Sequence, residues 1–251
     1  MLIYYIRHGD PIYDPDQLTP MGEEQAKALA NRLAVLGVDE VYSSPSNRAL
    51  QTAMPTCEAL GLTLTTLDFL NENELHGKLT IPANNGATAW LWADPVYSQI
   101  LCSKEVRELA DQWYTHPSLA PFGFEKTIHP INEEIDRFVA SFGYEHDTQK
   151  GLYKITEPHP EKKIAIFAHE CMGKIFMSHL LDVPFPYYAA HFEMHTSAFS
   201  VVRFDDGARK DPTKAPQPYA RARLLTLSND AHLYHEGLSL THRFTNMRET
   251  Y

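Results

Sequence analysis

The sequence predicts an α/β fold, a three-layer α/β/α arrangement in which helices cover both faces of a mostly parallel sheet. Residues 2–67 alternate short apolar runs with amphipathic helical patterns, and the same alternation returns from residue 164 onward. Between these parts, residues 78–160 are rich in aromatic residues, proline and histidine. A length of 251 residues suits one domain. We therefore expect a single domain over residues 1–251, with a helical and aromatic insertion at about 78–160 that covers the active-site end of the sheet.

The first strand and the first helix are each predicted by a local signal. Residues 2–6 form a short apolar run, typical of a strand that is buried on both faces. Thr19 followed by Pro20 is typical of a helix start, with the threonine as N-cap and the proline in the first turn. Apolar residues then recur at helical spacing, and Gly37 predicts the end of this helix.

A second strand and helix follow with the same signals. Residues 38–42 are predicted as the strand, and Ser44-Pro45 repeats the cap-plus-proline pattern that begins a helix. Gly61 is expected to end this helix, and Pro55 inside it predicts a kink because proline removes a backbone donor. Residues 63–67 are predicted to be extended.

Later elements follow from the same patterns. They are helices near 103–115 and 131–142, a buried strand at 164–168 with a helix through Leu181, and strands at 196–204 and 222–227. Asp206-Gly207 and three prolines predict a loop at 206–219, between the last two strands.

The composition excludes several classes of function. Hydrophobic residues make up 43% and charged residues 22% of the chain, as in ordinary globular proteins. The net charge of −10 argues against a nucleic-acid partner, because such proteins carry a basic excess. No apolar stretch approaches the roughly 18 residues of a membrane span, so no membrane partner is expected. The first residues show no signal-peptide pattern and the three cysteines are scattered, so we expect a cytoplasmic protein.

Cationic and imidazole side chains follow the predicted strands. Arg7 and His8 come directly after the first strand, His169 follows the strand at 164–168, and Arg48 lies in the first turn of the second helix. The carboxyl ends of the strands in an open α/β sheet form the edge where ligands bind. Guanidinium groups suit the oxygens of a phosphoryl group, and histidine can carry that group covalently. The sequence therefore predicts a phosphoryl site at this edge.

Five segments carry a resemblance to a known family. They are Arg7-His8-Gly9, residues 18–26, residues 43–53, Leu70-Asn71-Glu72 and Ala168-His169-Glu170. In this order, and in these strand and helix contexts, they resemble the histidine phosphatase superfamily, which includes the cofactor-dependent phosphoglycerate mutases. The resemblance covers residues 1–77 and 163–204 and leaves the insertion unmatched.

This resemblance implies a histidine-phosphatase-like domain that hydrolyses phosphomonoesters through a phosphohistidine intermediate. His8 would be the nucleophile and Glu72 the proton donor and acceptor, with His169 also catalytic. The residues that hold the phosphoryl oxygens would be Arg7, Arg48 and His169. Neither a metal nor a cofactor is implied, so the enzyme would be a metal-independent phosphomonoesterase of the histidine acid phosphatase type. Its partner would be a small phosphorylated substrate.

Some alternatives stay open. Glu74 lies two residues after Glu72 and would share its face in an extended segment, so it is the second candidate for the acid and base. Asp10 and Asp14 would repel a second phosphate, which favours a phosphatase over a phosphoglycerate mutase-type phosphotransferase. A non-catalytic module of the same fold that binds a phosphate ligand is the third possibility. The physiological substrate and the oligomeric state are not predicted.

The insertion and the remaining histidines receive plainer interpretations. The aromatic residues fit a small satellite core better than a substrate-binding wall, and the two can coexist. Such a wall would suit a bulky or aromatic phosphomonoester. These aromatic residues are Trp90, Trp92, Tyr97, Trp113, Tyr114, Phe122 and Phe124. Histidine spacing predicts no metal site, because His191 and His195 lack the zinc-protease order and His146-Asp147 is an isolated dipeptide. Cys171 is expected near the site as an uncharged packing residue.

Overall fold

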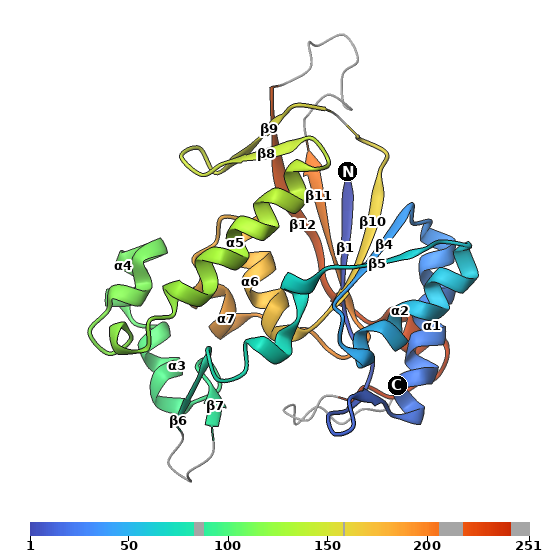
Figure 1. The fold of residues 1–251 in the computed structure, drawn as a ribbon, viewed down its shortest axis with the longest axis horizontal. Coiled ribbons are helices and arrows are strands. Elements are labelled where there is room, and N and C mark those ends of the chain that lie inside the picture. The colour runs from blue at the N-terminus through green and yellow to red at the C-terminus, as the bar shows by residue number, and fades with distance from the viewer. Residues whose placement is uncertain (83–87, 158, 206–217, 242–251) are drawn as a thin grey trace.

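A mixed sheet forms the centre of the molecule. The computed structural model describes residues 1–82, 88–157, 159–205 and 218–241. Over these residues the sheet has eight strands in the order β5-β4-β10-β1-β11-β12-β9-β8 (Figure 1). In that order the strands are β5 (Leu64–Thr66), β4 (Glu40–Ser43), β10 (Lys163–Ala168), β1 (Leu2–Arg7), β11 (Phe199–Asp205), β12 (Tyr219–Asn229), β9 (Leu152–Ile155) and β8 (Tyr144–Asp147).

The predicted α/β class is confirmed, but the sheet is mixed where a mostly parallel one was predicted. The pairings from β5 through β4 and β10 to β1 are parallel, and those from β1 through β11, β12 and β9 to β8 are antiparallel. Strand direction was not evident from the sequence, because a strand covered on both faces is an apolar run in either orientation.

Helices cover both faces of the sheet, as predicted. They include α1 (Pro20–Leu36) and α2 (Asn47–Leu60) on one side, and α5 (Glu125–Ala140) and α6 (Glu170–Leu180) on the other (Figure 1). Tyr4 and Ile6 of β1 belong to the core formed with α1 and α2. Ile3 and Tyr5 belong to the core formed with α5 and α6. Because alternate residues of a strand face opposite sides, the unbroken apolar run of β1 supplies both cores.

Local capping chemistry fixes the first helix where it was predicted. The Thr19 hydroxyl accepts a hydrogen bond from the Gly22 N–H at 3.0 Å, and Pro20 occupies the first turn of α1. The helix ends at Gly37, whose φ is 74°. This position is in the left-handed region that glycine adopts without strain.

The second helix begins later than predicted. Its N-cap is Ser46 and its first residue is Asn47, whereas the Ser44-Pro45 pattern placed the start two residues earlier. The Ser44 hydroxyl accepts the Ser46 N–H at 3.3 Å and lies 2.9 Å from His169 Nε2, so it is engaged away from this helix. The helix is assigned without interruption through Pro55.

The insertion packs against the sheet and α6 and shares their hydrophobic core. Its elements before α5 are β6 (Thr80–Pro82), β7 (Thr88–Trp90), α3 (Pro95–Leu101), α4 (Lys104–Leu109), η3 (Ala110–Thr115) and η4 (Ala120–Phe122). The helix predicted near 131–142 is α5, which begins at Glu125, and the pattern at 103–115 divides into α4 and η3. Trp113 and Phe124 stack at 5.7 Å and lie in the core that also contains α6 residues. The aromatic residues therefore join the main core on this face of the sheet, whereas a separate satellite core was predicted.

Short elements complete the described chain. They are β2 (Pro11–Ile12), β3 (Gln17–Leu18), η1 (Asp68–Leu70), η2 (Glu72–Glu74), α7 (Phe185–His191) and α8 (Ala231–His235). Most of the loop predicted at 206–219 lies outside the described residues. Within the part that is described, no helix combines the length and the apolar character that crossing a membrane requires.

Candidate active site

His8 lies at the carboxyl end of β1, and its side chain is buried. Its N–H donates to the Ala168 carbonyl at 3.0 Å, and its carbonyl accepts the Ser197 N–H at 2.9 Å. The next residue, Gly9, packs against the start of α1, where a Cβ atom would come within 2.8 Å of the Gly22 carbonyl oxygen. Only glycine fits this approach, so close backbone packing fixes the position of His8.

The hydrogen bonding of the His8 ring determines which nitrogen can react. Nδ1 lies 2.7 Å from the Gly9 carbonyl oxygen. Because a carbonyl can only accept, Nδ1 carries the proton and Nε2 keeps its lone pair. Burial, and then the charges of Arg7 and Arg48, hold the pKa of His8 well below its ordinary value. The ring is therefore a neutral imidazole with Nε2 available as a nucleophile.

Two buried arginines stand beside this ring. Arg7 ends β1, donates to the Met194 carbonyl and pairs with Glu170 Oε2 at 2.6 Å. Arg48 lies in the first turn of α2, with Nη1 at 2.8 Å from Asp16 Oδ1. Both positive charges lower the pKa of His8, so both guanidinium groups act electrostatically on the same site.

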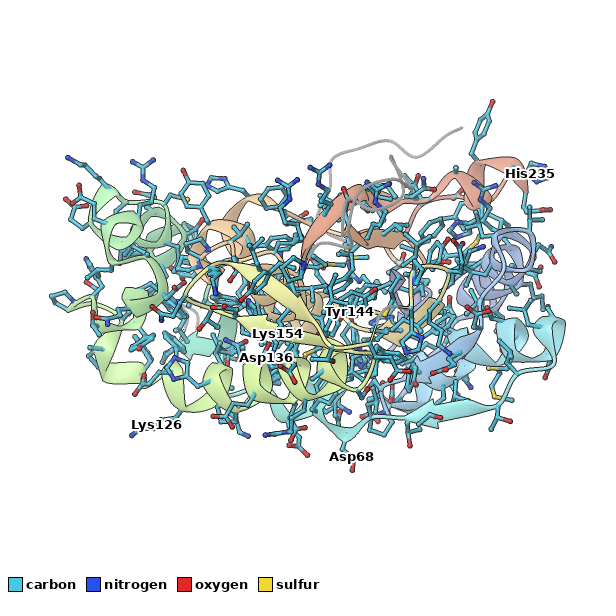
Figure 2. The ribbon with its side chains drawn as sticks, turned by 90° about the horizontal axis from the view of Figure 1, so that it is seen from above. Asp68, Lys126, Asp136, Tyr144, Lys154 and His235 are labelled. Carbon is cyan, nitrogen blue, oxygen red and sulfur yellow. The ribbon has the colours of Figure 1, made fainter. Side chains whose placement is uncertain are left out.

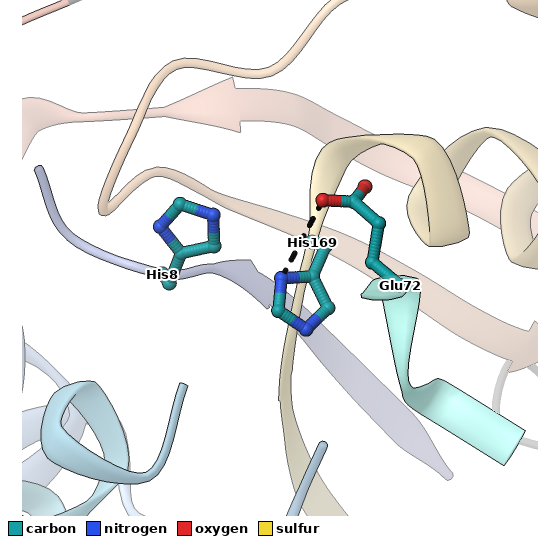
Figure 3. Close-up of side chains that lie close together, drawn as sticks. All are labelled: His8, Glu72 and His169. Carbon is teal, nitrogen blue, oxygen red and sulfur yellow. Dashed lines mark ion pairs between the residues drawn. The ribbon is translucent and has the colours of Figure 1, made fainter. Parts of the chain in front are cut away.

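His169 brings a second imidazole to the same place. Its ring centroid lies 5.2 Å from that of His8, with 60° between the planes (Figure 3). Its Nε2 lies 2.9 Å from Ser44 Oγ and 3.2 Å from Ser46 Oγ. Each serine hydroxyl can either donate to Nε2 or accept from it, so these two contacts fit both neutral tautomers of the His169 ring. Burial, followed by the charges of its neighbours, lowers the pKa of His169 well below its ordinary value.

Glu72 reaches the site from η2. Its Oε2 lies 3.7 Å from His169 Nδ1 (Figure 3), longer than a hydrogen bond, and 3.5 Å from Arg48 Nη2. Its Oε1 accepts the Cys171 N–H at 2.8 Å. Burial raises the pKa of Glu72, although Arg48 opposes that shift. A carboxyl group that holds its proton more strongly than usual is suited to donate it.

Glu74 lies elsewhere. The segment is a 3₁₀ turn and not an extended strand, so a spacing of two residues does not place Glu72 and Glu74 on one face. Glu74 is exposed and lines a separate cavity together with Lys78 and Lys126. Of the two glutamates, Glu72 is the one close to His169.

Several site residues were not singled out from the sequence. Glu170 pairs with Arg7, and Lys174, whose side chain is buried, lies 3.4 Å from Glu170 Oε1. Their spacing of four residues on one helix was a usable signal, because such residues are neighbours on a helix surface. Asp16 and Ser44 carried no comparable signal, since their contacts with the site depend on tertiary folding. Cys171 does lie at the site, where its backbone N–H donates to Glu72. Burial raises the pKa of its thiol.

The arrangement suits an anion better than a metal cation. Ligand atoms of His8, Glu72 and His169 lie within 4.8 Å of one another, close enough to surround one ion. Arg7 and Arg48 stand at the same place and would repel a dication. The two guanidinium groups are donors that match the oxygens of a tetrahedral oxyanion, and the neutral His8 ring presents a lone pair at Nε2.

Comparisons with known proteins agree with this fold. Residues 3–119 match the family model of the histidine phosphatase superfamily, branch 1. A curated relative, a putative phosphoserine phosphatase 2 of Hydrogenobacter thermophilus, is 34% identical over 88 residues, which is 30% of this chain and 43% of the relative. The match thus spans less than half the length of that relative. These findings show that residues 3–119 are similar in sequence to the histidine phosphatase superfamily.

Solved structures show the same fold along nearly the whole chain. Mycobacterial glucosyl-3-phosphoglycerate phosphatase with inorganic phosphate is similar at a TM-score of 0.56 and 19% identity, over 92% of this chain and 98% of that one. Phosphoserine phosphatase of Entamoeba histolytica with 3-phosphoglyceric acid is similar at 0.56 and 18% identity, over 92% and 98%. At these identities the likeness concerns the fold.

Proposed function

We propose that this protein hydrolyses phosphomonoesters through a phosphohistidine intermediate on His8. The observation that carries the proposal is the fixed tautomer of His8: Nδ1 is held by the Gly9 carbonyl, which leaves Nε2 as a lone-pair donor beside two guanidinium groups. Nucleophilic catalysis divides one difficult displacement into two easier ones.

In the first step, His8 Nε2 attacks phosphorus while the bond from phosphorus to the ester oxygen breaks. Glu72 supplies the proton that this leaving oxygen takes up, a role supported by its raised pKa. Arg7, Arg48 and His169, in the tautomer that carries a proton on Nδ1, donate hydrogen bonds to the phosphoryl oxygens and stabilise their charge in the transition state.

In the second step, water attacks the phosphohistidine and the bond from phosphorus to nitrogen breaks. Glu72, now a carboxylate, takes a proton from that water, and inorganic phosphate leaves. Charge on the transferred group is balanced by arginine side chains in this scheme, so we propose that the chemistry needs no metal ion, as expected of a histidine acid phosphatase-type enzyme.

The substrate proposed is a small phosphomonoester. The relatives named above act on or bind phosphoserine, 3-phosphoglycerate or a glucosylated 3-phosphoglycerate, which supports a small phosphorylated metabolite. The aromatic residues of the insertion pack mainly with one another and with the core, so they offer little support for an aryl substrate.

The test is to trap the intermediate. The wild-type protein and His8→Ala are mixed with a ³²P-labelled phosphomonoester, quenched and denatured, with chelator present throughout. We expect label on the wild-type protein alone, stable in alkali and labile in acid, as a phosphoramidate is. Release of phosphate without a labelled protein, or equal release from His8→Ala, would refute the mechanism. Transfer to a second sugar or acid phosphate faster than hydrolysis would instead support the mutase alternative.

A further inference from the structure

A second cluster of imidazole and carboxylate groups lies where α5, β8 and α6 meet. Asp136 Oδ1 lies 2.9 Å from His146 Nδ1 and 2.8 Å from His179 Nε2. Ligand atoms of these three residues all lie within 4.8 Å of one another. The His146 side chain is 1% exposed and that of His179 is 14% exposed, so the two imidazoles are held away from bulk water.

The orientation of His146 is fixed by groups outside this trio. Its ring stacks on Tyr153 with centroids 4.5 Å apart and 10° between the planes. Its Nε2 lies 3.1 Å from Asp182 Oδ1, on the side opposite Asp136. Histidines that bind metals usually donate their second ring N–H to a carboxylate in this way, which fixes the tautomer and increases the basicity of the ligating nitrogen.

A cavity opens next to the cluster. Its volume is about 230 Å³, and its lining includes His146, His179, Asp182 and Asn132. Asn132 Oδ1 is buried and has no hydrogen-bond partner among the described residues. The cavity therefore offers space for a further ligand, such as water, and a carbonyl oxygen available to hydrogen-bond with it.

The distances suit a small transition-metal ion. In a tetrahedral site with bonds of about 2.0 Å, neighbouring ligand atoms stand roughly 3.3 Å apart. The Asp136–His146 and Asp136–His179 separations are 2.9 and 2.8 Å, so the ligands would open by about half an ångström around a Zn²⁺ ion. Two imidazoles with one carboxylate suit zinc and its neighbours in the first transition series better than Mg²⁺ or Ca²⁺, which prefer oxygen.

We propose that Asp136, His146 and His179 form a structural site for a zinc-like divalent ion, with Asp182 as the carboxylate behind His146. The ion would join α5 and β8 of the insertion to α6, a helix on the same face of the sheet as α5. Figure 2 views this side of the molecule, with Asp136 beside the β8–β9 hairpin. The site is separate from the catalytic one, because His179 is ten residues along α6 from His169, a rise of about 15 Å.

This proposal revises the expectation that the chain holds no metal. That expectation rested on spacing along the sequence, and the three ligands are too far apart in the chain to form a recognisable motif. His146 and His179 lie 10 and 43 residues from Asp136. Folding alone brings them together.

The test measures zinc binding and thermal unfolding on the full chain after removal of metal by a chelator. All proteins carry His8→Ala, so that the His8, Glu72 and His169 cluster cannot account for the signal. ZnCl₂ is titrated into this background, into His179→Gln and into Asp182→Asn. The matched control is His129→Gln, which alters another histidine lining the same cavity.

We expect one Zn²⁺ per chain and a higher melting temperature with zinc in the background protein and in His129→Gln. His179→Gln should lose the zinc-dependent rise, and Asp182→Asn should bind zinc about 10–100-fold more weakly. Co²⁺ in place of Zn²⁺ should give visible absorption that His179→Gln lacks. No binding by the background protein, or equal binding by all variants, would overturn the proposal and leave the cluster as a hydrogen-bonded network.

Discussion

Glu170 Oε2 lies 2.6 Å from Arg7 Nη1, so the residue that follows His169 holds the arginine that precedes His8. The pair links β1 to the first turn of α6, and both side chains are largely buried. Lys174 stands 3.4 Å from the other oxygen of the same carboxylate. Glu170 therefore fixes the direction of the Arg7 guanidinium, which makes it a positioning residue for the proposed site.

Glu170→Gln is expected to lower kcat/KM for a phosphomonoester by about 10–100-fold, because a misplaced catalytic group costs on this order. The loss should fall mainly on kcat, since Arg7 would still be present but would point less well at the transition state. Glu170→Asp should recover part of the rate. The matched control is Glu23→Gln, an exposed glutamate in the first turn of α1. An unchanged kcat in Glu170→Gln would contradict the positioning role.

Asp16 is predicted to compete with phosphate for Arg48, because the two residues form an ion pair. Its Oδ1 lies 2.8 Å from Arg48 Nη1, and its Oδ2 accepts the Asn47 N–H at 2.8 Å. Asp16→Asn keeps an oxygen for that N–H and removes the charge, so inorganic phosphate should inhibit this variant about two- to fivefold more tightly, consistent with an ion pair worth up to about 1 kcal/mol. The neighbouring exposed Asp14→Asn is the control. Equal inhibition constants for the two variants would show that Asp16 does not occupy the anion site.

Glu72→Gln separates proton donation from phosphoryl binding. Alkyl phosphates need a proton on the leaving oxygen, so their hydrolysis should fall about 10²–10⁴-fold. A nitrophenyl phosphate has a good leaving group that needs no proton. The rate of phosphoenzyme formation from this substrate, measured by rapid quench, should therefore fall much less. Glu74→Gln should behave as the wild type with both substrates, because that side chain is exposed and lines another cavity. The reverse result would assign the acid and base to Glu74.

The pH dependence of the same reaction follows from two opposite shifts. Burial raises the pKa of Glu72 above 4.5 and lowers that of His8 well below 6.5. The first step needs Glu72 protonated and His8 neutral, so kcat/KM for an alkyl phosphate should decrease as pH rises through the pKa of Glu72. His8 stays neutral in that range and adds no acidic limb near pH 6.5. Glu72→Gln should remove the decrease, and a profile that it leaves unchanged would point to another titrating group.

Features of the fold that depend on contacts between neighbouring residues could be predicted from the sequence, and features that depend on distant contacts could not. The Thr19 cap and the apolar strand at residues 2–6 were readable because they depend on neighbouring residues. The antiparallel direction of β11 and the pairing of β12 with β9 depend on contacts between distant segments, and no local pattern records them. The order and pairing register of the strands in the sheet are decided by such distant contacts.

The same distinction applies to the candidate site. Arg7, His8 and His169 were found because strand ends and a family resemblance pointed to them, while Asp16 stands in a loop with no pattern of its own. Its contact with Arg48 joins residues 32 positions apart. Charge partners of this kind are chosen by tertiary packing, so they become visible only in the folded molecule.

His232 on α8 is predicted to limit stability in acid. Burial is the main cause that lowers its pKa to about 4, and the nearby Asp230 only partly opposes this shift. Its Nε2 lies 3.0 Å from Ser197 Oγ, and Nδ1 has no hydrogen-bond partner among the described residues. The folded state therefore keeps the ring neutral in a pH range where the unfolded chain takes up a proton. Above about pH 6.5 the ring is neutral in both states and costs the folded state nothing. As pH falls from there toward 4, the unfolded chain takes up the proton first, and the free energy of unfolding decreases by roughly 3 kcal/mol in total.

Urea unfolding of the wild type and His232→Gln at pH 7.5, 6 and 4.5 measures this effect. The variant should be less stable at pH 7.5, because it loses a buried ring, but its free energy of unfolding should fall less steeply with acid. Other buried histidines, such as His8 and His169, titrate in both proteins and cancel in the difference. His235→Gln alters an exposed histidine of the same helix and should keep the wild-type slope. Parallel slopes for the wild type and His232→Gln would mean that this ring is protonated equally in the folded and unfolded states.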